Sequence, residues 1–247
     1  YYSQFPSHNT VCVDGISSYP VMKSNHSFEL LSCFPASAEP GGEFTSVTYS
    51  NLYFREPESR ADQTRMMGIV TTAPETGYYV DVFRSRKEKG GDKMHDYFYH
   101  NLGQTLTLTA ADGTDLNLQP TEELAFAGAH LYAYSYLYDK KVAATNKDVK
   151  ATFTIDMKDK DGDDIYMNLW MKGEPDREVF TALAPMTEGL SRTPNMPYNI
   201  KEQPTLTFVA RQHGEAWNRP FVSIYEPSTK KEPSAIQSVS YFDVEGV

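Results

Sequence analysis

Apolar and polar residues alternate with a period of two along most of the chain, which is the pattern of half-buried β-strands. The alternation is cleanest at 78–84, Tyr-Tyr-Val-Asp-Val-Phe-Arg, where Tyr79, Asp81 and Phe83 share one face. No stretch keeps the 3.6-residue period of an amphipathic helix. About fourteen strands separated by short turns predict an all-β fold, a large antiparallel β-sandwich of stacked sheets.

The expected strands cover 10–13, 28–34, 44–54, 65–72, 78–84, 95–102, 105–109, 116–118, 129–138, 149–156, 165–171, 206–212, 221–225 and 236–242. Two hairpins are predicted. The first joins 78–84 to 95–102 around Gly90-Gly91, and the second joins 149–156 to 165–171 around the acidic turn 159–164. The turn 159–164 has Asp164 at the sixth position, where an EF-hand needs glycine, and strands are expected on both sides where an EF-hand has helices, so calcium is a minor alternative there. No linker divides the chain, so 1–247 is expected to form a single unit, with a weak break near 145.

The stretch 129–138 has the strongest strand pattern, and it places a row of tyrosines on one face: Tyr132, Tyr134, Tyr136 and Tyr138. Tyrosine rings can stack on sugar rings. They can equally pack on cross-strand neighbours with their hydroxyl groups in water, which is the commoner case. Tyr132, Tyr134 and Tyr136 are therefore candidate carbohydrate contacts.

Composition changes this picture in two ways. The 247 residues include 40% hydrophobic residues, which suffice for a core, and 13% aromatic residues, which favour strands. The net charge of −10 argues against a nucleic-acid partner, because phosphate backbones are bound through basic patches. No apolar run approaches the roughly 18 residues of a membrane span.

An acidic polysaccharide would need a local basic cluster to overcome the negative charge of the chain. The candidates are Arg84, Arg86, Lys87, Lys89 and Lys93. The plainer interpretation of this charge run is a solvated hairpin tip, and it is the commoner one. Arg84 is kept as a candidate carbohydrate contact.

Histidines, an aspartate and cysteines are candidates for chemistry, and each has a structural alternative. His95 and His100 are five residues apart, so a strand turns them to opposite faces, and core hydrogen bonding is expected for both. Asp81, on an otherwise apolar face, is expected to pair within the sheet. Cys12 and Cys33 could form one bridge or remain two free thiols. No serine or cysteine nucleophile motif, phosphate loop or dinucleotide fingerprint is present.

Four stretches, taken together, resemble one family. They are His-Asn-Thr-Val followed by Val-Asp-Gly at 8–15, the pair Tyr53 and Arg65, Tyr-Val-Asp-Val-Phe-Arg followed by Gly-Gly and His-Asp-Tyr between 79 and 97, and Pro-Phe-Val-x-x-Tyr-Glu-Pro at 220–227. Their order and spacing are similar to the C-terminal β-sandwich of the heparinase II/III-like polysaccharide lyases. The resemblance covers most of the chain, and it is specific in combination, whereas each piece alone is weak.

The resemblance implies an α/α-toroid domain upstream of the sandwich and β-elimination on uronic-acid polysaccharides such as heparan, chondroitin or alginate. In the zinc-containing members the histidine of His-Asn-Thr is a metal ligand, which corresponds to His8. The other ligands, the catalytic tyrosine and its Asn or His partner have no match in this chain. His8 alone offers one of the four ligands of a closed zinc site, so a hydrogen-bonded histidine at a strand end is the plainer interpretation.

The sequence therefore predicts the sandwich part of a polysaccharide lyase, with an acidic polysaccharide and the upstream toroid as partners and a periplasmic or extracellular location. We expect no catalytic residue in this chain and no activity from it alone. A chain that opens on Tyr1 without Met is expected to be a processed or excised fragment. The alternative is a non-catalytic carbohydrate-binding or structural sandwich that uses its tyrosine rows.

Overall fold

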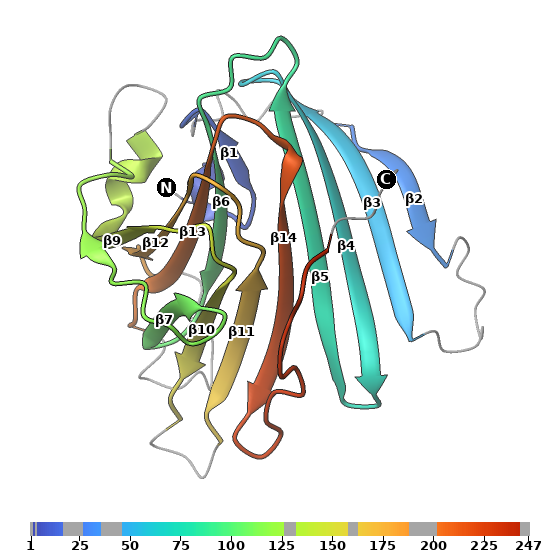
Figure 1. Cartoon of the computed structure of the whole chain (residues 1–247), viewed down its shortest axis with the longest axis vertical. Helices are drawn as coiled ribbons and strands as arrows, with labels where there is room; N and C mark the ends of the chain where they lie inside the picture. Colours follow the sequence, from blue (N-terminus) through green and yellow to red (C-terminus); the bar gives the residue numbers. More distant parts are fainter. Residues whose placement is uncertain are drawn as a thin grey trace.

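The computed structural model describes residues 2, 4–16, 27–35, 46–125, 132–157, 163–187 and 202–242, and for Tyr132 the backbone alone. Within these residues fourteen strands form two antiparallel sheets that stack as a β-sandwich (Figure 1). The only helical segments described there are two short 3-10 turns, η1 (Phe5–Ser7) and η2 (Tyr132–Tyr136). The all-β sandwich predicted from the alternation is confirmed.

The smaller sheet has six strands, in the spatial order β1 (Val11–Val13), β6 (Met94–Asn101), β13 (Thr205–His213), β12 (Arg177–Ala184), β9 (Tyr138–Ala144) and β8 (Gln119–Pro120). The larger sheet has eight strands, in the order β2 (Glu29–Phe34), β3 (Val47–Glu56), β4 (Ala61–Ala73), β5 (Thr76–Lys87), β14 (Ala216–Thr229), β11 (Ile165–Met171), β10 (Val149–Ile155) and β7 (Thr105–Ala110). Both sheets combine strands from before and after residue 145.

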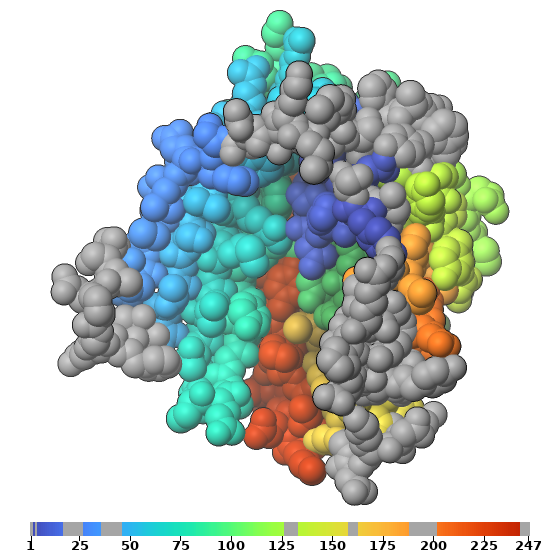
Figure 2. All heavy atoms as spheres, turned by 180° about the vertical axis from the view of Figure 1, so that it is seen from behind, coloured from blue at the N-terminus to red at the C-terminus, as the bar shows by residue number. Residues whose placement is uncertain are grey.

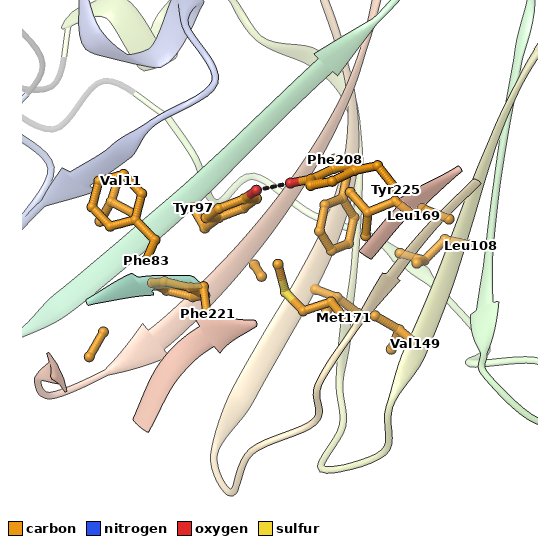
Figure 3. Packing of buried hydrophobic residues seen from close by; sticks show 14 of the residues in the cluster. Val11, Phe83, Tyr97, Leu108, Val149, Leu169, Met171, Phe208, Phe221 and Tyr225 are labelled. Atoms are coloured by element: carbon orange, nitrogen blue, oxygen red, sulfur yellow. Dashed lines mark hydrogen bonds between the residues drawn. The ribbon is translucent and has the colours of Figure 1, made fainter. Parts of the chain in front are cut away.

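The main core lies between the two sheets, where alternate residues of each strand point inward. Figure 3 shows Phe83 and Phe221 of the larger sheet beside Tyr97 of the smaller sheet, and Leu169 of the larger sheet near Phe208 of the smaller sheet. All five side chains are buried. Burial of large apolar side chains of this kind is the main stabilising contribution to a sandwich.

The outer face of the smaller sheet is buried as well. Cys12, Phe98, Phe180 and Val209 point outward from it and are covered by Tyr134 of η2, together with other residues of a second apolar cluster. This segment makes a partial third layer, and it explains why β6 and β13 are buried on both faces.

The two sheets are offset. In Figure 1 the strands β2, β3 and β4 fan out beyond the edge of the smaller sheet, whose edge strand β1 lies beside β5. The inward face of these strands therefore stays uncovered: Met67 and Ile69 are 42% and 46% exposed, although they continue the alternation of the buried Gln63. This uncovered face is the main surface feature of the fold.

Two pairing predictions have different outcomes. The hairpin between 149–156 and 165–171 is confirmed, because β10 and β11 pair in antiparallel register. The hairpin between 78–84 and 95–102 is wrong: β5 pairs with β4 and β14, while β6 pairs with β1 and β13. The segment with Gly90-Gly91 crosses from one sheet to the other, and glycines at positive φ serve such a crossing as well as a tight hairpin.

The strand predicted at 129–138 is wrong over the part that the structure describes up to Tyr136. Residues 132–136 form η2, and β9 begins only at Tyr138. Tyr134 packs on Phe98 at the outer face of the smaller sheet, with 5.5 Å between the ring centroids. This burial overrides the β propensity of the tyrosines. The residues 126–131 lie outside the described residues.

Other boundaries shift. The predicted strands 116–118 and 236–242 form no strand, and β8 covers only Gln119–Pro120. The pattern predicts neither β12 nor the part of β9 that follows Tyr138. Most of the acidic turn 159–164 and of the Pro-rich stretch 185–204 lies outside the described residues. Among the helices that the structure describes, none is long and apolar enough for a membrane crossing.

Candidate functional site

Three stretches that carried the sequence resemblance meet in space. They belong to β1 with the residues before it, to β5 and to β6. Asn9 joins them: its side-chain Oδ1 accepts a hydrogen bond of 2.7 Å from the backbone N–H of His100, and its carbonyl accepts one of 2.9 Å from Arg65 Nη1. The shared motifs therefore mark the junction where the edge of the smaller sheet sits on the larger one.

A buried ion pair forms the centre of this junction. The guanidinium of Arg65 donates to both carboxylate oxygens of Asp81, at 3.0 Å and 2.7 Å. Tyr97 of the facing sheet donates to Asp81 Oδ2 at 2.8 Å, and its hydroxyl also hydrogen bonds to Tyr225 (Figure 3). Burial raises the pKa of Tyr97 well above its usual value, so the phenol stays protonated. The prediction that Asp81 pairs within the sheet is confirmed.

His95 is buried in the core beside this pair. Its Nε2 lies 2.8 Å from Asp92 Oδ1, and its Nδ1 lies 3.0 Å from Ser85 Oγ. Burial lowers the pKa of His95, so the neutral ring donates to the carboxylate and accepts from the hydroxyl. The expected core hydrogen bonding is confirmed, and the ring has no free nitrogen for chemistry.

His8 and His100 lie at the other end of the junction. His100 Nε2 donates to the carbonyl of Pro6 at 2.8 Å, and its Nδ1 accepts from Thr207 Oγ1 at 2.9 Å. Burial lowers the pKa of His100 to about 4. His8 is exposed. Within the described residues no group of three or more His, Cys, Asp or Glu side chains could hold a metal ion.

The donor set present in the described residues therefore does not fit a zinc site. His8 would contribute one ligand, and both ring nitrogens of the nearby His100 are already hydrogen-bonded. His8 as a metal ligand stays a prediction that needs further ligands from elsewhere.

A second buried ion pair lies on the outer face of the smaller sheet. Arg211 donates to both oxygens of Asp96, at 2.7 Å and 3.0 Å, and its Nη1 lies 3.1 Å from Glu123 Oε2. Tyr134 donates to Asp96 Oδ2 at 2.8 Å. This pair anchors the third layer. No pattern in the sequence predicts it, because its members lie far apart along the chain.

The candidate carbohydrate contacts are placed differently from one another. Tyr134 is 1% exposed, so its ring is not at a surface where a sugar could stack. Tyr136 is 45% exposed. The side chain of Tyr132 lies outside the described residues. Arg84 is half-buried, and its Nη1 donates to the carbonyl of Trp217 at 2.5 Å.

The uncovered inward face of β2–β5 forms a groove with two hollows that share Met67. The first hollow, of about 420 Å³, is lined by Phe5, Thr10, Phe28, Leu52, Phe54, Glu56, Pro57, Arg65, Met67 and Phe83. The second, of about 630 Å³, is lined by Cys33, Phe34, Pro35, Thr48, Tyr49, Ser50, Met67, Gly68, Ile69 and Tyr79. Figure 2 shows these strands, blue to teal, lying open beside the dark-blue N-terminal residues.

We call this surface the apolar groove. Arg65 and Asp81 close its inner end as an ion pair whose two charges neutralise each other. The carboxylate of Glu56 also lines the first hollow, where it accepts hydrogen bonds from the backbone N–H groups of Glu58 and Ser59. Sequence patterning missed the groove, because its apolar residues have the same alternation as core residues. An exposed apolar patch of this extent marks a surface that contacts another molecule or another part of the same protein.

The cysteines are both free. Cys12 lies in the smaller sheet and is buried, and burial raises the pKa of its thiol well above the usual value. Cys33 lies in β2 of the other sheet, at the second hollow of the apolar groove. The alternative of a bridge between them is therefore excluded.

Comparison with known proteins gives one informative match. No protein-family model matches the sequence. Over 196 residues, 78% of this chain, the sequence is 32% identical to the endo-acting ulvan lyase of Formosa agariphila. The chain spans about a fifth of that relative, 22% of its length. The chain is thus related in sequence to part of a polysaccharide lyase, which confirms the resemblance at this coarse level without specifying the heparinase II/III-like family.

The buried ion pair yields a stability prediction. We expect Asp81→Ala to lower the free energy of unfolding by about 3–5 kcal/mol, because the guanidinium of Arg65 and the hydroxyl of Tyr97 both lose their carboxylate. Urea unfolding monitored by fluorescence measures this loss. As a control, Lys147→Ala removes an exposed ion pair with Asp112 and should change stability by less than about 0.5 kcal/mol. Equal effects of the two substitutions would contradict the assignment.

The low pKa of His100 yields a pH prediction. The folded pKa of about 4 lies below the value of about 6.5 in the unfolded chain, so protons bind preferentially to the unfolded state. Stability contributed by neutral His100 is complete above pH ~6.5 and is lost as the pH falls toward 4, by about 3 kcal/mol.

Urea unfolding between pH 7 and pH 4 tests this dependence. In His100→Gln, whose amide can still donate to Pro6, the part of the pH dependence between 6.5 and 4 should disappear. Lys147→Gln, which changes an exposed side chain that takes no part in the contacts of His100, should keep the wild-type slope. An unchanged slope in His100→Gln would show that another group titrates.

Proposed function

We propose that this chain is the β-sandwich part of a polysaccharide lyase that cleaves a uronic-acid-containing polysaccharide of the ulvan type by β-elimination. The observation that carries the proposal is the 32% identity over 196 residues to an endo-acting ulvan lyase. The convergence of the motif residues around Asn9, Arg65 and Asp81 supports it, because the same residues that carry the resemblance build the junction between the sheets.

β-Elimination needs a base for the proton at C5, an acid for the leaving oxygen and a group that neutralises the uronate carboxylate. The described tyrosine and arginine side chains at the junction are unsuited to these roles. Tyr97 and Arg65 are tied to Asp81, and Tyr134 and Arg211 are tied to Asp96. We therefore propose that the reacting groups come from another part of the lyase, an α/α-toroid of the heparinase II/III-like type.

The apolar groove is proposed as the surface on which that catalytic part packs. Seven of the ten residues lining its first hollow are apolar, and the charge of Arg65 there is already neutralised. Such a surface gains nothing from a hydrated, negatively charged polysaccharide, whereas it gains free energy when apolar protein side chains cover it. The junction residues, with exposed His8 beside them, would then form the wall of the cleft next to the catalytic part.

A polymeric substrate also bears on location. A polysaccharide chain is too large to cross a bacterial membrane by diffusion, so its endo-acting cleavage takes place outside the cytoplasm. We propose a periplasmic or extracellular location on this ground. The alternative, a non-catalytic carbohydrate-binding module, would keep polysaccharide binding but would not require a catalytic part on the apolar groove.

Lyase activity provides the direct test. We expect the 247-residue chain alone to release no unsaturated uronide from ulvan, measured by ultraviolet absorbance, because the tyrosine and arginine side chains described at the junction are tied to carboxylates. A longer polypeptide that joins this segment to its catalytic part should release the product. Product release by the isolated chain, or no release from any polypeptide that contains it, would overturn the proposal.

The packing of the apolar groove has its own test in that longer polypeptide. We expect Ile69→Glu, in the second hollow, to lower the lyase rate at least about tenfold and to expose the domain junction to proteolysis, because a buried unpaired carboxylate opposes packing. Val70→Glu is the matched control, since its side chain points to the opposite face of β4 and lies beside Tyr78, at the far end of the strand from Arg84 and Arg86.

The outcome depends on the difference between these neighbours. Because Ile69 is 46% exposed in the sandwich itself, Ile69→Glu should leave the melting temperature of the isolated chain nearly unchanged. Equal rates for the two variants would show that the catalytic part does not cover the apolar groove.

A further inference from the structure

The face of the larger sheet opposite to the apolar groove carries a second group of aligned side chains. Arg84 and Arg86 are two residues apart on β5, so both point outward, while Ser85 between them is buried in the core. Trp217 lies beside them, in the irregular part of β14 between the pairs Ala216–Ser85 and Phe221–Phe83.

Trp217 is held firmly in this position. The carboxylate of Glu215 accepts hydrogen bonds from the backbone N–H groups of Trp217 and Asn218, at 2.5 Å and 2.9 Å. Arg84 Nη1 donates to the carbonyl of Trp217. The guanidinium of Arg86 lies over the indole ring, 4.2 Å from its centroid. The tryptophan thus serves as a platform that orients the planar guanidinium of Arg86.

Several arginines of the chain are held by a carboxylate, and Arg86 is not one of them. Arg55 pairs with Glu88, Arg65 with Asp81, and Arg211 with Asp96. Arg86 is exposed, and within the described part of the chain no carboxylate lies at ion-pair distance from it. A stacked guanidinium with its N–H donors directed to solvent is suited to bind a carboxylate or sulfate group in a bidentate way.

The described carboxylates near Arg86 keep their negative charge, but each is held by other groups and none of them forms an ion pair with Arg86. Asp62 lies opposite Arg86 on β4, but its Oδ1 accepts a hydrogen bond of 2.8 Å from Tyr53. Glu88 is occupied by Arg55, and Glu215 by backbone N–H groups. The hairpin-tip interpretation of the charge run therefore does not describe Arg84 and Arg86, which belong to a sheet face. The chain has a net charge of −10, so an anionic polymer can bind it only where positive charges are close together, as Arg84 and Arg86 are.

We propose that Arg84, Arg86 and Trp217 form a second binding site, on the outward face of the larger sheet, for the carboxylate or sulfate groups of an acidic polysaccharide. The identity of the polymer rests on the proposed function, whereas the site itself rests on the geometry of these residues. The two arginines are roughly 7 Å apart along the strand, so one extended polymer contacts both. The site holds the polymer to the sandwich, away from the reacting groups.

Binding of ulvan to the 247-residue chain at low ionic strength, measured by titration calorimetry, tests the site. Arg86→Gln should weaken binding about tenfold, because it removes a charged, bidentate hydrogen-bonding group. Trp217→Leu should weaken it to a similar degree by releasing the guanidinium. Lys147→Gln removes the same charge from an exposed side chain elsewhere and should change affinity less than about twofold.

Chemically altered ligands identify the recognised group. Binding should fall for ulvan with its carboxyl groups reduced, for ulvan with any sulfate esters removed, or for both, and it should be absent for neutral dextran. Unchanged binding of both altered polymers would overturn the proposal, as would wild-type affinity in Arg86→Gln with an unchanged melting temperature. Equally tight binding of single-stranded DNA would also overturn it, since it would show general attraction of polyanions.

The result of the ulvan-binding experiment can be distinguished from the result of the lyase assay. If the wild-type chain binds no ulvan, the second site is refuted, while product release by the longer polypeptide can still support the proposed function. If the site is confirmed and no polypeptide containing the segment releases product, the chain is a carbohydrate-binding module and the lyase proposal fails.

Discussion

The bidentate pair between Arg65 and Asp81 is the interaction on which the rest of the structure depends. Through it β4 and β5 are joined to the residues before β1, and through Tyr97 they are joined to the facing sheet. A carboxylate with no exposed surface could not be held there without these donors. The pair fixes where the smaller sheet ends over the larger one, and so it determines where the apolar groove begins.

The offset between the sheets divides the larger sheet into surfaces with different uses. The inward face is core under the smaller sheet and becomes the apolar groove beyond Arg65. The outward face stays polar near Arg86 and Trp217. An apolar surface favours protein partners, whereas oriented guanidinium groups favour anions, so one sheet can contact a catalytic part on one side and a polymer on the other.

Alternation in the sequence was sufficient to predict the sandwich, because a period of two depends only on which face of each strand is buried. It could not predict which strands pair. Gly90-Gly91 suits a tight hairpin and a crossing between sheets equally well, so the sequence pattern cannot tell whether β5 and β6 pair with each other. The alternation also predicted a strand at Tyr134, which is wrong. The Tyr134 hydroxyl donates a hydrogen bond to Asp96, 38 residues away in the chain, and such a distant partner is not visible in a local pattern. The apolar groove was hidden for a similar reason: Met67 fits the pattern of Gln63 and Arg65, and only the length of the facing sheet decides which is covered.

The edge strand β2 has a consequence for the chain in isolation. It ends the larger sheet in the part of the chain that the structure describes, and its residues Leu30, Leu31 and Phe34 are exposed. Such an edge has unpaired backbone N–H and C=O groups and exposed apolar side chains on both faces. A strand of a second copy can pair with it, which leads to aggregation. A sandwich released from a covering domain would therefore tend to precipitate, and solubility itself would report whether this flank of the protein is occupied.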